Sequence, residues 1–239
     1  MPTKPAAPLF QYSPEILRDF PRINGGIIIA HNISNPLTPD ALQKQYRDEQ
    51  EAVRLRIGET PLSEIESLNA WRRAFSAFGV SPTQYRSAAE ALLRRLTKKG
   101  DIPSINTLVD IGNLVSIRYG LPVAVVDTCE VMGTITVHYA DGSEHFTELG
   151  NDEPLHPDMG EVIFSDEQKA VIARRWCWRQ SASSAAKEDT TDIIITVEAQ
   201  HEGAQEDMRK AVGDLLNLLQ AYAGGTYESA VLSTDHPAI

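Results

Sequence analysis

The order in which hydrophobic patterns follow one another constrains the fold of this chain most strongly. Through residue 119 the apolar side chains mainly recur every three or four positions, which is typical of helices that bury one face. From residue 123 onward, β-branched and alternating runs indicate strands, and a last helical pattern covers residues 205–222. Helices followed by strands and one closing helix predict an α+β fold with layered sheets packed against helices, rather than the βαβ winding of a parallel sheet.

Capping residues place the helices more closely. Helices are expected to begin at Thr38, Ser63 and Ser81, because Ser and Thr side chains accept hydrogen bonds from the first free N–H groups of a helix. A fourth helix is expected over residues 104–119, and a short strand over residues 26–30 precedes all four.

The expected strands of the second half cover residues 123–126, 133–139, 144–149, 161–164, 170–178 and 193–198. Asp141-Gly142 is a strong signal for a tight turn, and it predicts that the second and third of these strands form a hairpin. The fourth and fifth strands are expected to form another hairpin. Residues after Tyr227 show no such pattern and are expected to be a loose tail.

Charge and composition exclude several classes of protein. The formal net charge of −11 argues against a broad electrostatic grip on nucleic acid and against DNA as a partner, but it leaves room for RNA contact through a local basic patch. Short apolar runs and a start without an apolar segment predict a cytoplasmic protein with no membrane partner. The 2 cysteines and 6 histidines show neither a disulfide framework nor the spacing of metal ligands, so no metal and no cofactor are expected.

The run Arg-Trp-Cys-Trp-Arg-Gln-Ser at residues 175–181 is the most distinctive segment for function. On a strand, the two tryptophans and Gln180 would share one face, while both arginines and Cys177 would share the other. Tryptophan beside arginine can stack on a planar ligand, and guanidinium groups can bind phosphate or carboxylate. Alternatively, one tryptophan belongs to the core and the arginines lie at a solvated edge.

Two polar positions in otherwise apolar elements are further candidates. Asn113 is either a ligand contact or a buried amide with its own partners, and the neighbouring Gly112 permits close approach of a backbone or a substrate. Glu198 ends an apolar strand, where an unpaired carboxylate is costly to bury. It can pair with a buried cation, bind an amino group or position a water, and structural pairing is the more frequent role.

Basic residues gather on two neighbouring expected helices. They could form one face that binds an RNA backbone, or a solvated helix face with no partner. The positions are Arg72, Arg73, Arg86, Arg94, Arg95, Lys98 and Lys99.

An ordered set of short motifs connects the chain to a known module. The set comprises Ser81-Pro82-Thr83-Gln84-Tyr85-Arg86, Ile102-Pro103-Ser104-Ile105-Asn106, Val109-Asp110-Ile111-Gly112-Asn113-Leu114-Val115-Ser116, Leu121-Pro122, Asp127, Gly133, residues 176–181, Glu188-Asp189-Thr190-Thr191 and Glu198. In this order the motifs resemble the tRNA-binding and editing domain, or B-three/B-four domain, of the bacterial phenylalanyl-tRNA synthetase beta subunit, in its free-standing form. The resemblance implies a helical extension at residues 1–80 packed on the core, an editing-like domain at residues 81–226 and a tail at residues 227–239.

The resemblance also implies roles for single residues. In the synthetase, this module removes tyrosine wrongly attached to the phenylalanine tRNA, and by motif its asparagine and glutamate correspond to Asn113 and Glu198, the expected catalytic residues. The expected substrate-binding residues are Trp178, Arg179, Gln180, Ser181, Thr190 and Gly112. The chain departs from the family at Ala124, where the family has a histidine, and at residues 178–181, which are bulky and cationic where the family has a Gly-Gly loop.

Three functions are compatible with these features and stand as hypotheses. The first is a stand-alone binder of tRNA or aminoacyl-tRNA that acts in trans as an editing deacylase, with Arg179 on the terminal phosphate, Trp178 stacked on the adenine and a positioned water attacking the ester. The second is a non-catalytic RNA-binding or regulatory module, favoured by Ala124 and the bulky loop. The third is a protein that binds free amino acids or related metabolites, favoured by the acidic net charge.

Overall fold

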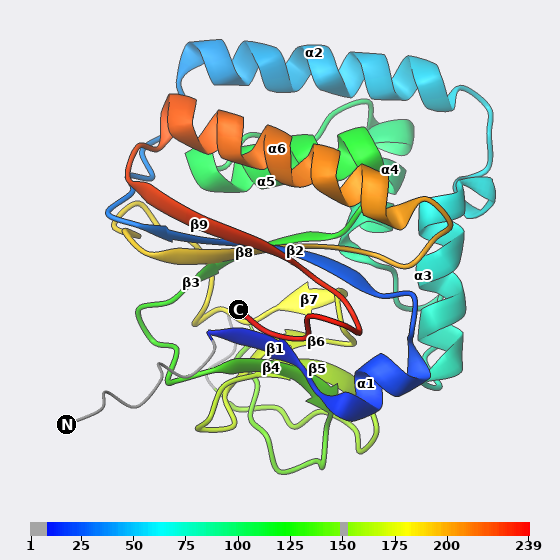
Figure 1. Ribbon diagram of the computed structural model, residues 1–239. Helices are drawn as coiled ribbons and strands as arrows, with labels where there is room; N and C mark the ends of the chain where they lie inside the picture. The colour runs from blue at the N-terminus through cyan, green and yellow to red at the C-terminus, as the bar shows by residue number, and fades with distance from the viewer. Residues whose placement is uncertain (1–8, 149–152) are drawn as a thin grey trace.

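The computed structural model describes residues 9–148 and 153–239, and these fold into three stacked layers (Figure 1). A helical layer lies at the top of Figure 1, an upper four-stranded sheet lies beneath it, and a lower five-stranded sheet forms the other side. The helical layer contains α2 (Asp40–Ile57), α4 (Ala88–Lys99), α5 (Thr107–Tyr119) and α6 (Ala204–Tyr222). The predicted α+β class with layered sheets is confirmed. None of the helices in the described ranges is both long and apolar enough to cross a membrane.

The upper sheet is antiparallel throughout and determines where Glu198 points. Its strands, in spatial order, are β3 (Val123–Asp127), β8 (Ile193–Ala199), β2 (Asn24–His31) and β9 (Thr226–Leu232). Successive side chains of a strand point to opposite faces. Ile195 and Val197 of β8 therefore pack in the core under the helices, whereas Ile194 and Glu198 face the lower sheet.

The lower sheet joins β1 and β4 in parallel and its other neighbours antiparallel. Its strands, in spatial order, are β1 (Phe10–Tyr12), β4 (Ile135–Tyr139), β5 (Val162–Ser165), β6 (Val171–Arg174) and β7 (Arg179–Gln180). A second hydrophobic core fills the space between the sheets, and α3 (Glu66–Ala77) contributes Trp71 and Phe75 to it from the side. The short helix α1 (Pro14–Asp19) and the 3₁₀ helix η1 (Leu62–Glu64) complete the described elements.

The helix expected to begin at Ser81 begins instead at Ala88. Ser87 supplies the cap, because its side-chain oxygen accepts the backbone N–H of Glu90 at 3.3 Å. The earlier Ser81 closes only one turn, in which its carbonyl accepts the Tyr85 N–H. The helix therefore begins six residues later than its first serine suggests.

The hairpin predicted at Asp141-Gly142 is wrong. The turn forms, and the Glu144 carboxylate accepts both backbone N–H groups of this pair at 3.0 Å. However, β4 pairs with β5, and the described part of the expected third strand makes only isolated bridges through His145 and Phe146. Residue 149 lies outside the described residues. The Glu144 side chain therefore closes the turn through its hydrogen bonds, but the residues after the turn do not pair with β4.

Both ends of the described chain belong to the sheets. The loose tail expected after Tyr227 is wrong, because β9 pairs with β2 along the edge of the upper sheet and Ala238 bridges Gln11. In the segment expected as a helical extension, β2 lies between β8 and β9 in the upper sheet. This segment therefore supplies an inner strand of the fold rather than an addition to it.

Candidate functional site

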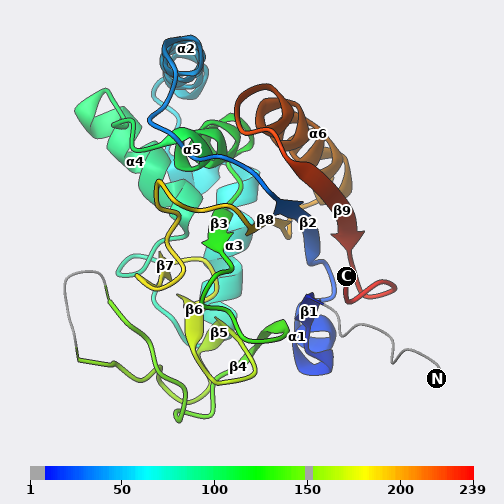
Figure 2. The same ribbon diagram turned by 90° about the vertical axis from the view of Figure 1, so that its left-hand side faces the viewer.

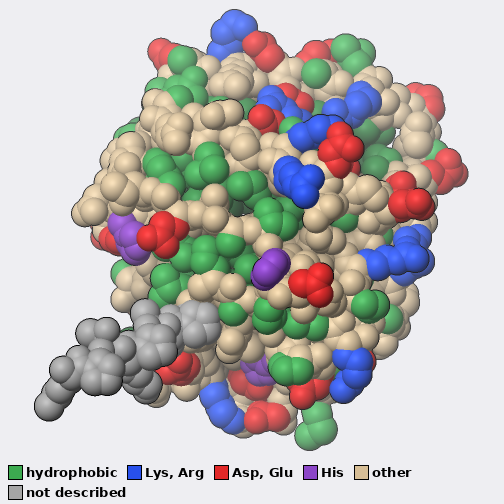
Figure 3. Space-filling model, in the orientation of Figure 1, with side chains coloured by type: hydrophobic (Ala, Val, Ile, Leu, Met, Phe, Trp, Pro, Cys, Tyr) green, Lys and Arg blue, Asp and Glu red, His purple; other side chains and the backbone are tan. Residues whose placement is uncertain are grey.

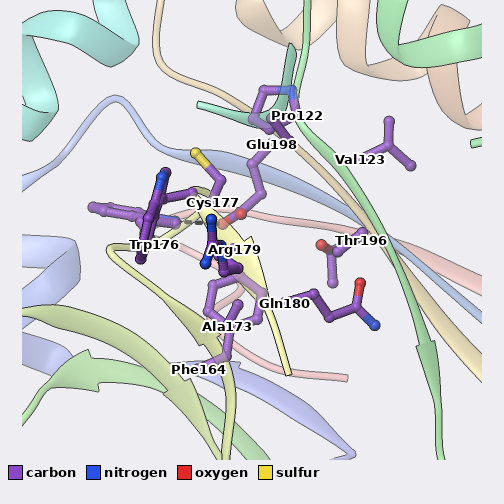
Figure 4. A pocket seen from close by; sticks show the side chains of 13 residues that line it. Pro122, Val123, Phe164, Ala173, Trp176, Cys177, Arg179, Gln180, Thr196 and Glu198 are labelled. Atoms are coloured by element: carbon purple, nitrogen blue, oxygen red, sulfur yellow. Dashed lines mark hydrogen bonds between the residues drawn. The ribbon is translucent and has the colours of Figure 1, made fainter. Parts of the chain in front are cut away.

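A small pocket opens between the two sheets, at the turn that joins β6 to β7 (Figure 4). It encloses about 60 Å³, and its walls include Ala124 and Thr196 from the upper sheet and Phe164 and Ala173 from the lower sheet. Ala124, which stands where the family has a histidine, thus lines the pocket with a methyl group. Glu198 is the one carboxylic acid among the described lining residues.

Glu198 is 2% exposed, and one of its two oxygens is firmly held. Oε1 accepts hydrogen bonds from the Tyr12 hydroxyl at 2.6 Å and from the Trp176 indole N–H at 3.0 Å. Among the described residues, no group forms a hydrogen bond with Oε2. Burial raises the pKa of Glu198 from its ordinary value of 4.5 to about 7, while the Trp176 and Tyr12 bonds act in the opposite direction. The carboxyl group therefore keeps its proton to a higher pH than an ordinary glutamate does.

A glycine opposite Glu198 makes room for the Tyr12 hydroxyl. Gly25 lies directly across from Glu198 in the ladder between β2 and β8, and a side chain there would collide with the Tyr12 ring and hydroxyl. Burial, and then the nearby Glu198 charge, raises the pKa of Tyr12 well above its ordinary value. Tyr12 therefore stays protonated and remains a hydrogen-bond donor.

The strand predicted over residues 170–178 ends early, and its predicted alternation of faces is wrong. β6 ends at Arg174, and residues 175–178 form a turn in which Arg175 and Trp176 have positive φ angles of 44° and 63°. L-residues disfavour this left-handed region by about 1–2 kcal/mol each. The turn buries the Trp176 ring 5.2 Å from the centre of the Trp71 ring and directs its N–H to Glu198.

Buried hydrogen bonds hold this strained turn. Glu161, 3% exposed, accepts two bonds from the Arg174 guanidinium group at 3.0 and 2.7 Å, and a third from the Arg175 backbone N–H at 2.9 Å. The Trp176 backbone N–H donates to the Val162 carbonyl at 2.6 Å. Because charge-assisted bonds are stronger than neutral ones, this network offsets the strain of the turn.

Trp178 and Arg179 line the pocket, and the buried Arg175 packs against Trp178. The guanidinium carbons of Arg175 and Arg179 are 4.7 and 4.5 Å from the centre of the Trp178 ring, and Arg175 is also 3.9 Å from the centre of the Tyr85 ring. Arg179 pairs with Glu148, yet its side chain is 47% exposed. A ligand in the pocket therefore meets an indole with the exposed Arg179 guanidinium group stacked on it, while Arg175 stays buried.

Three of the predicted substrate-binding residues fasten the loops beside the pocket. Gln180 lines the pocket, but its amide N–H groups donate to two backbone carbonyls at 2.8 and 2.7 Å. Ser181 donates to another carbonyl at 3.1 Å, and Thr190 donates to the Asp127 carboxylate. Ser181 and Thr190 do not line the pocket, and their hydrogen bonds stabilise the neighbouring loops.

The structure corrects the expectation that Asn113 and Glu198 act in one pocket. A Cβ atom at Gly112 would lie 3.0 Å from the Val125 side chain, so this glycine lets α5 approach β3 closely on the helical side of the sheet. Asn113 lies beside the Tyr46 hydroxyl of α2 and opposes the rise in the pKa of Tyr46 that burial causes. β3 and β8 therefore stand between Asn113 and Glu198 (Figure 1).

Of the two residues that hold Glu198, the sequence points to Trp176, within the run at residues 175–181, but not to Tyr12. Tyr12 lies 186 positions away and belongs to no motif. Cys177 also lines the pocket, where burial raises the pKa of its thiol well above the ordinary value and so keeps it neutral. In the described parts of the chain, no group of three His, Cys, Asp or Glu side chains is placed to hold a metal ion.

Comparison with known proteins gives a consistent set of relatives. The sequence pattern of the B3/4 domain family matches residues 70–223. The phenylalanine–tRNA ligase beta subunit of Shewanella oneidensis is 28% identical over 116 residues, 48% of this chain and 14% of that subunit. The corresponding subunit of Cutibacterium acnes is 36% identical over 102 residues, 42% of this chain and 12% of that subunit. Each match therefore spans only a small share of the subunit's own length.

A crystal structure is also similar over most of the chain. An N-terminal fragment of the phenylalanyl-tRNA synthetase beta subunit from Pyrococcus horikoshii aligns with 97% of this chain and 56% of that fragment, with a TM-score of 0.46 and 11% sequence identity.

Proposed function

Because the chain belongs to the B3/4 domain family and is related over part of its length to phenylalanine–tRNA ligase beta subunits, we propose that it binds aminoacyl-tRNA and hydrolyses the aminoacyl ester. The aminoacyl group occupies the Glu198 pocket, and the terminal nucleotide lies at the open side of the pocket against Arg179. The protein would then act in trans, as a stand-alone deacylase.

The half-satisfied carboxyl group of Glu198 supports this proposal most strongly. A buried carboxylate is costly unless hydrogen bonds or a cation compensate it. Oε1 has two donors, whereas Oε2 has none among the described residues, and Glu198 lines the pocket. With a pKa of about 7, this group can take up and release a proton at neutral pH, which is what a general base requires.

Hydrolysis then needs one proton carrier and one water. Glu198 accepts a proton from the water, and the water oxygen bonds to the ester carbonyl carbon. The bond between that carbon and the ribose oxygen breaks, and the ribose oxygen takes the proton from Glu198. The free amino acid and the uncharged tRNA leave, and the carboxylate is restored. Tyr12 and Trp176 hold Oε1 in place, which orients Oε2 for the proton transfer.

The size of the pocket favours a small aminoacyl group. Its volume of about 60 Å³ is less than half of the roughly 150 Å³ of an engineered cavity that holds a benzene ring. Phe164 and Trp176, both almost fully buried, form rigid parts of the wall. We therefore expect glycyl, alanyl or seryl groups as substrates, rather than the tyrosyl group that the resemblance implies.

Deacylation of a panel of charged tRNAs tests the proposal. The protein is incubated with tRNAs that carry glycine, alanine, serine or tyrosine, and the charged fraction is followed over time. We expect turnover of the small aminoacyl groups. Glu198→Gln should lower the rate by about 10²–10⁴-fold, because an amide cannot accept the proton at neutral pH. The exposed Glu202→Gln is the matched control and should keep the wild-type rate.

Other outcomes identify the alternative functions. Binding of tRNA without turnover of any substrate would indicate a non-catalytic RNA-binding module. No binding of tRNA, together with a raised melting temperature in the presence of a free amino acid, would indicate a small-molecule binding protein.

A further inference from the structure

A second, basic groove lies beside the pocket and shares two lining residues with it. The groove has a volume of about 470 Å³ and runs along the exposed face of α4. Trp178 and Arg179 line both the groove and the Glu198 pocket. Figure 2 shows α4 and β7 on the same side of the molecule, with α6 on the other side of the helical layer.

Among the described residues, six cations and no carboxylate line this basic groove. They are Arg86, Arg94, Arg95, Lys98, Lys99 and Arg179. The whole chain carries a net charge of −11, and the face drawn in Figure 3 mixes acidic and basic side chains. Within the described residues, the side chains of Arg94, Lys98 and Lys99 form neither an ion pair nor a hydrogen bond. The groove therefore concentrates positive potential on an otherwise acidic protein.

Local stability does not explain this arrangement. Arg94 and Lys98 lie four positions apart on α4, as do the Arg and Lys that come directly after them, and like charges at this spacing destabilise a helix by about 0.2–0.5 kcal/mol per pair. The helix dipole favours cations in the last turn of α4. It does not account for Arg86, which precedes the helix, or for Arg179, which comes from β7. Cations from three segments converge, which favours an anionic partner.

We propose that the basic groove binds the phosphates of the single-stranded 3′ end of tRNA and leads that end into the Glu198 pocket. The inference rests on the function proposed above. Guanidinium groups bind phosphate through paired hydrogen bonds and stack on unpaired bases. The 12 residues of α4 extend about 18 Å at 1.5 Å per residue, which suits a few nucleotides of one strand. The strand enters near Lys98, and its last nucleotide reaches Arg179.

Charge reversal in the groove tests the binding of RNA. Arg94→Glu/Lys98→Glu reverses two exposed groove cations, and Arg209→Glu/Lys210→Glu makes the same change on α6 as the matched control. Affinity for uncharged tRNA is measured by fluorescence anisotropy across salt concentrations. The groove variant should bind at least tenfold more weakly, and the slope of log affinity against log salt should shrink by roughly 1.4, at about 0.7 per phosphate contact. The α6 control should keep the wild-type slope.

A truncated substrate separates the groove from the chemistry. Aminoacyl-adenosine carries the ester but no phosphate for the basic groove. Relative to wild type, the groove variant should lose at least ten times more hydrolysis rate on aminoacyl-tRNA than on aminoacyl-adenosine. Glu198→Gln should lose both activities equally and still bind tRNA.

The outcomes distinguish the two proposals. If the groove variant binds tRNA with the wild-type affinity and salt slope, the proposal that the basic groove binds RNA is refuted. An equal loss of affinity in the α6 control would refute it as well. If wild-type protein hydrolyses neither substrate, the proposed deacylase activity fails, and the binding arm still decides whether the groove takes the RNA. The milder Arg94→Gln/Lys98→Gln repeats the binding measurement should the charge reversal disturb folding. We expect a similar change in slope of roughly 1.4, because the same two phosphate contacts are lost, with a smaller loss of affinity.

Discussion

Replacing Glu198 by glutamine should stabilise the folded protein at pH 8 and leave its stability at pH 4 nearly unchanged. The pKa of Glu198 is about 7 in the folded state, against an ordinary value of 4.5 when the chain is unfolded and the group is hydrated. Between these pH values the folded state keeps a proton that the unfolded state has released. The free energy of unfolding therefore falls as the pH rises through this window.

The size of the effect can be worked out from the difference between the two pKa values. Each tenfold change in the protonation equilibrium is worth about 1.4 kcal/mol, so ionisation of Glu198 removes about 3 kcal/mol of stability by pH 8. Glutamine stays neutral at every pH, and its carbonyl oxygen can accept the bonds from Tyr12 and Trp176. Glu198→Gln should therefore be about 3 kcal/mol more stable than wild type at pH 8.

Urea denaturation at several pH values between 4 and 8 measures this difference. Wild type, Glu198→Gln and the exposed control Glu202→Gln are compared at each pH, so that the titration of all other groups cancels in the differences. The Glu198→Gln difference should rise with pH, and the Glu202→Gln difference should stay flat. A Glu198→Gln difference that does not change with pH would refute the raised pKa and the general-base role that depends on it.

Further changes test the packing and the chemistry. Glu161→Ala leaves a buried guanidinium group without its partner and should lower the free energy of unfolding by about 3–5 kcal/mol in urea; a loss below about 1 kcal/mol would contradict this. Gly26→Ala places a methyl group 2.7 Å from a buried sulfur and should destabilise by about 1–3 kcal/mol. Gly213→Ala, with open space on α6, should stabilise by about 0.5–1 kcal/mol; thermal melts that rank these two variants the other way would count against the packing. Tyr12→Phe removes a hydrogen bond that lowers the pKa of Glu198, so the rising limb of the pH–rate profile should move above pH 7; an unmoved limb would exclude Glu198 as the base.

Local sequence signals predicted correctly those elements whose boundaries are set by residues close in sequence. The helix expected over residues 104–119 is α5, which Asn106 caps through its own side chain and Gly120 closes in the left-handed conformation. The strand expected over residues 193–198 is β8. The signals failed at Ser81 and at Asp141-Gly142, because each motif can either start the expected helix or hairpin or form an isolated turn. Both motifs make a single turn, and distant pairing decides which element the chain enters after that turn.

The candidate site shows the same division between near and distant contacts. The sequence singled out Glu198 as a carboxylate at the end of an apolar strand, and it singled out Trp178 and Arg179, which line the same pocket. It also grouped Asn113 with them through resemblance, although the upper sheet separates that residue from Glu198. Spacing on one element fixes which side chains share a face, but it carries no information about which element packs across from that face.

By itself, the sequence therefore determined the α+β class and the period of elements such as α5 and β8. It also showed the cations along α4 and the single acid on β8. Only the tertiary structure decided that this acid shares one oxygen with Tyr12 and Trp176 and leaves the other unbonded within the described chain. Only the tertiary structure, too, decided that the α4 cations line one groove with Arg179, which also lines the Glu198 pocket. The physical reason is that the pKa of Glu198 depends on burial, and burial is created by two sheets whose strands lie far apart in the chain.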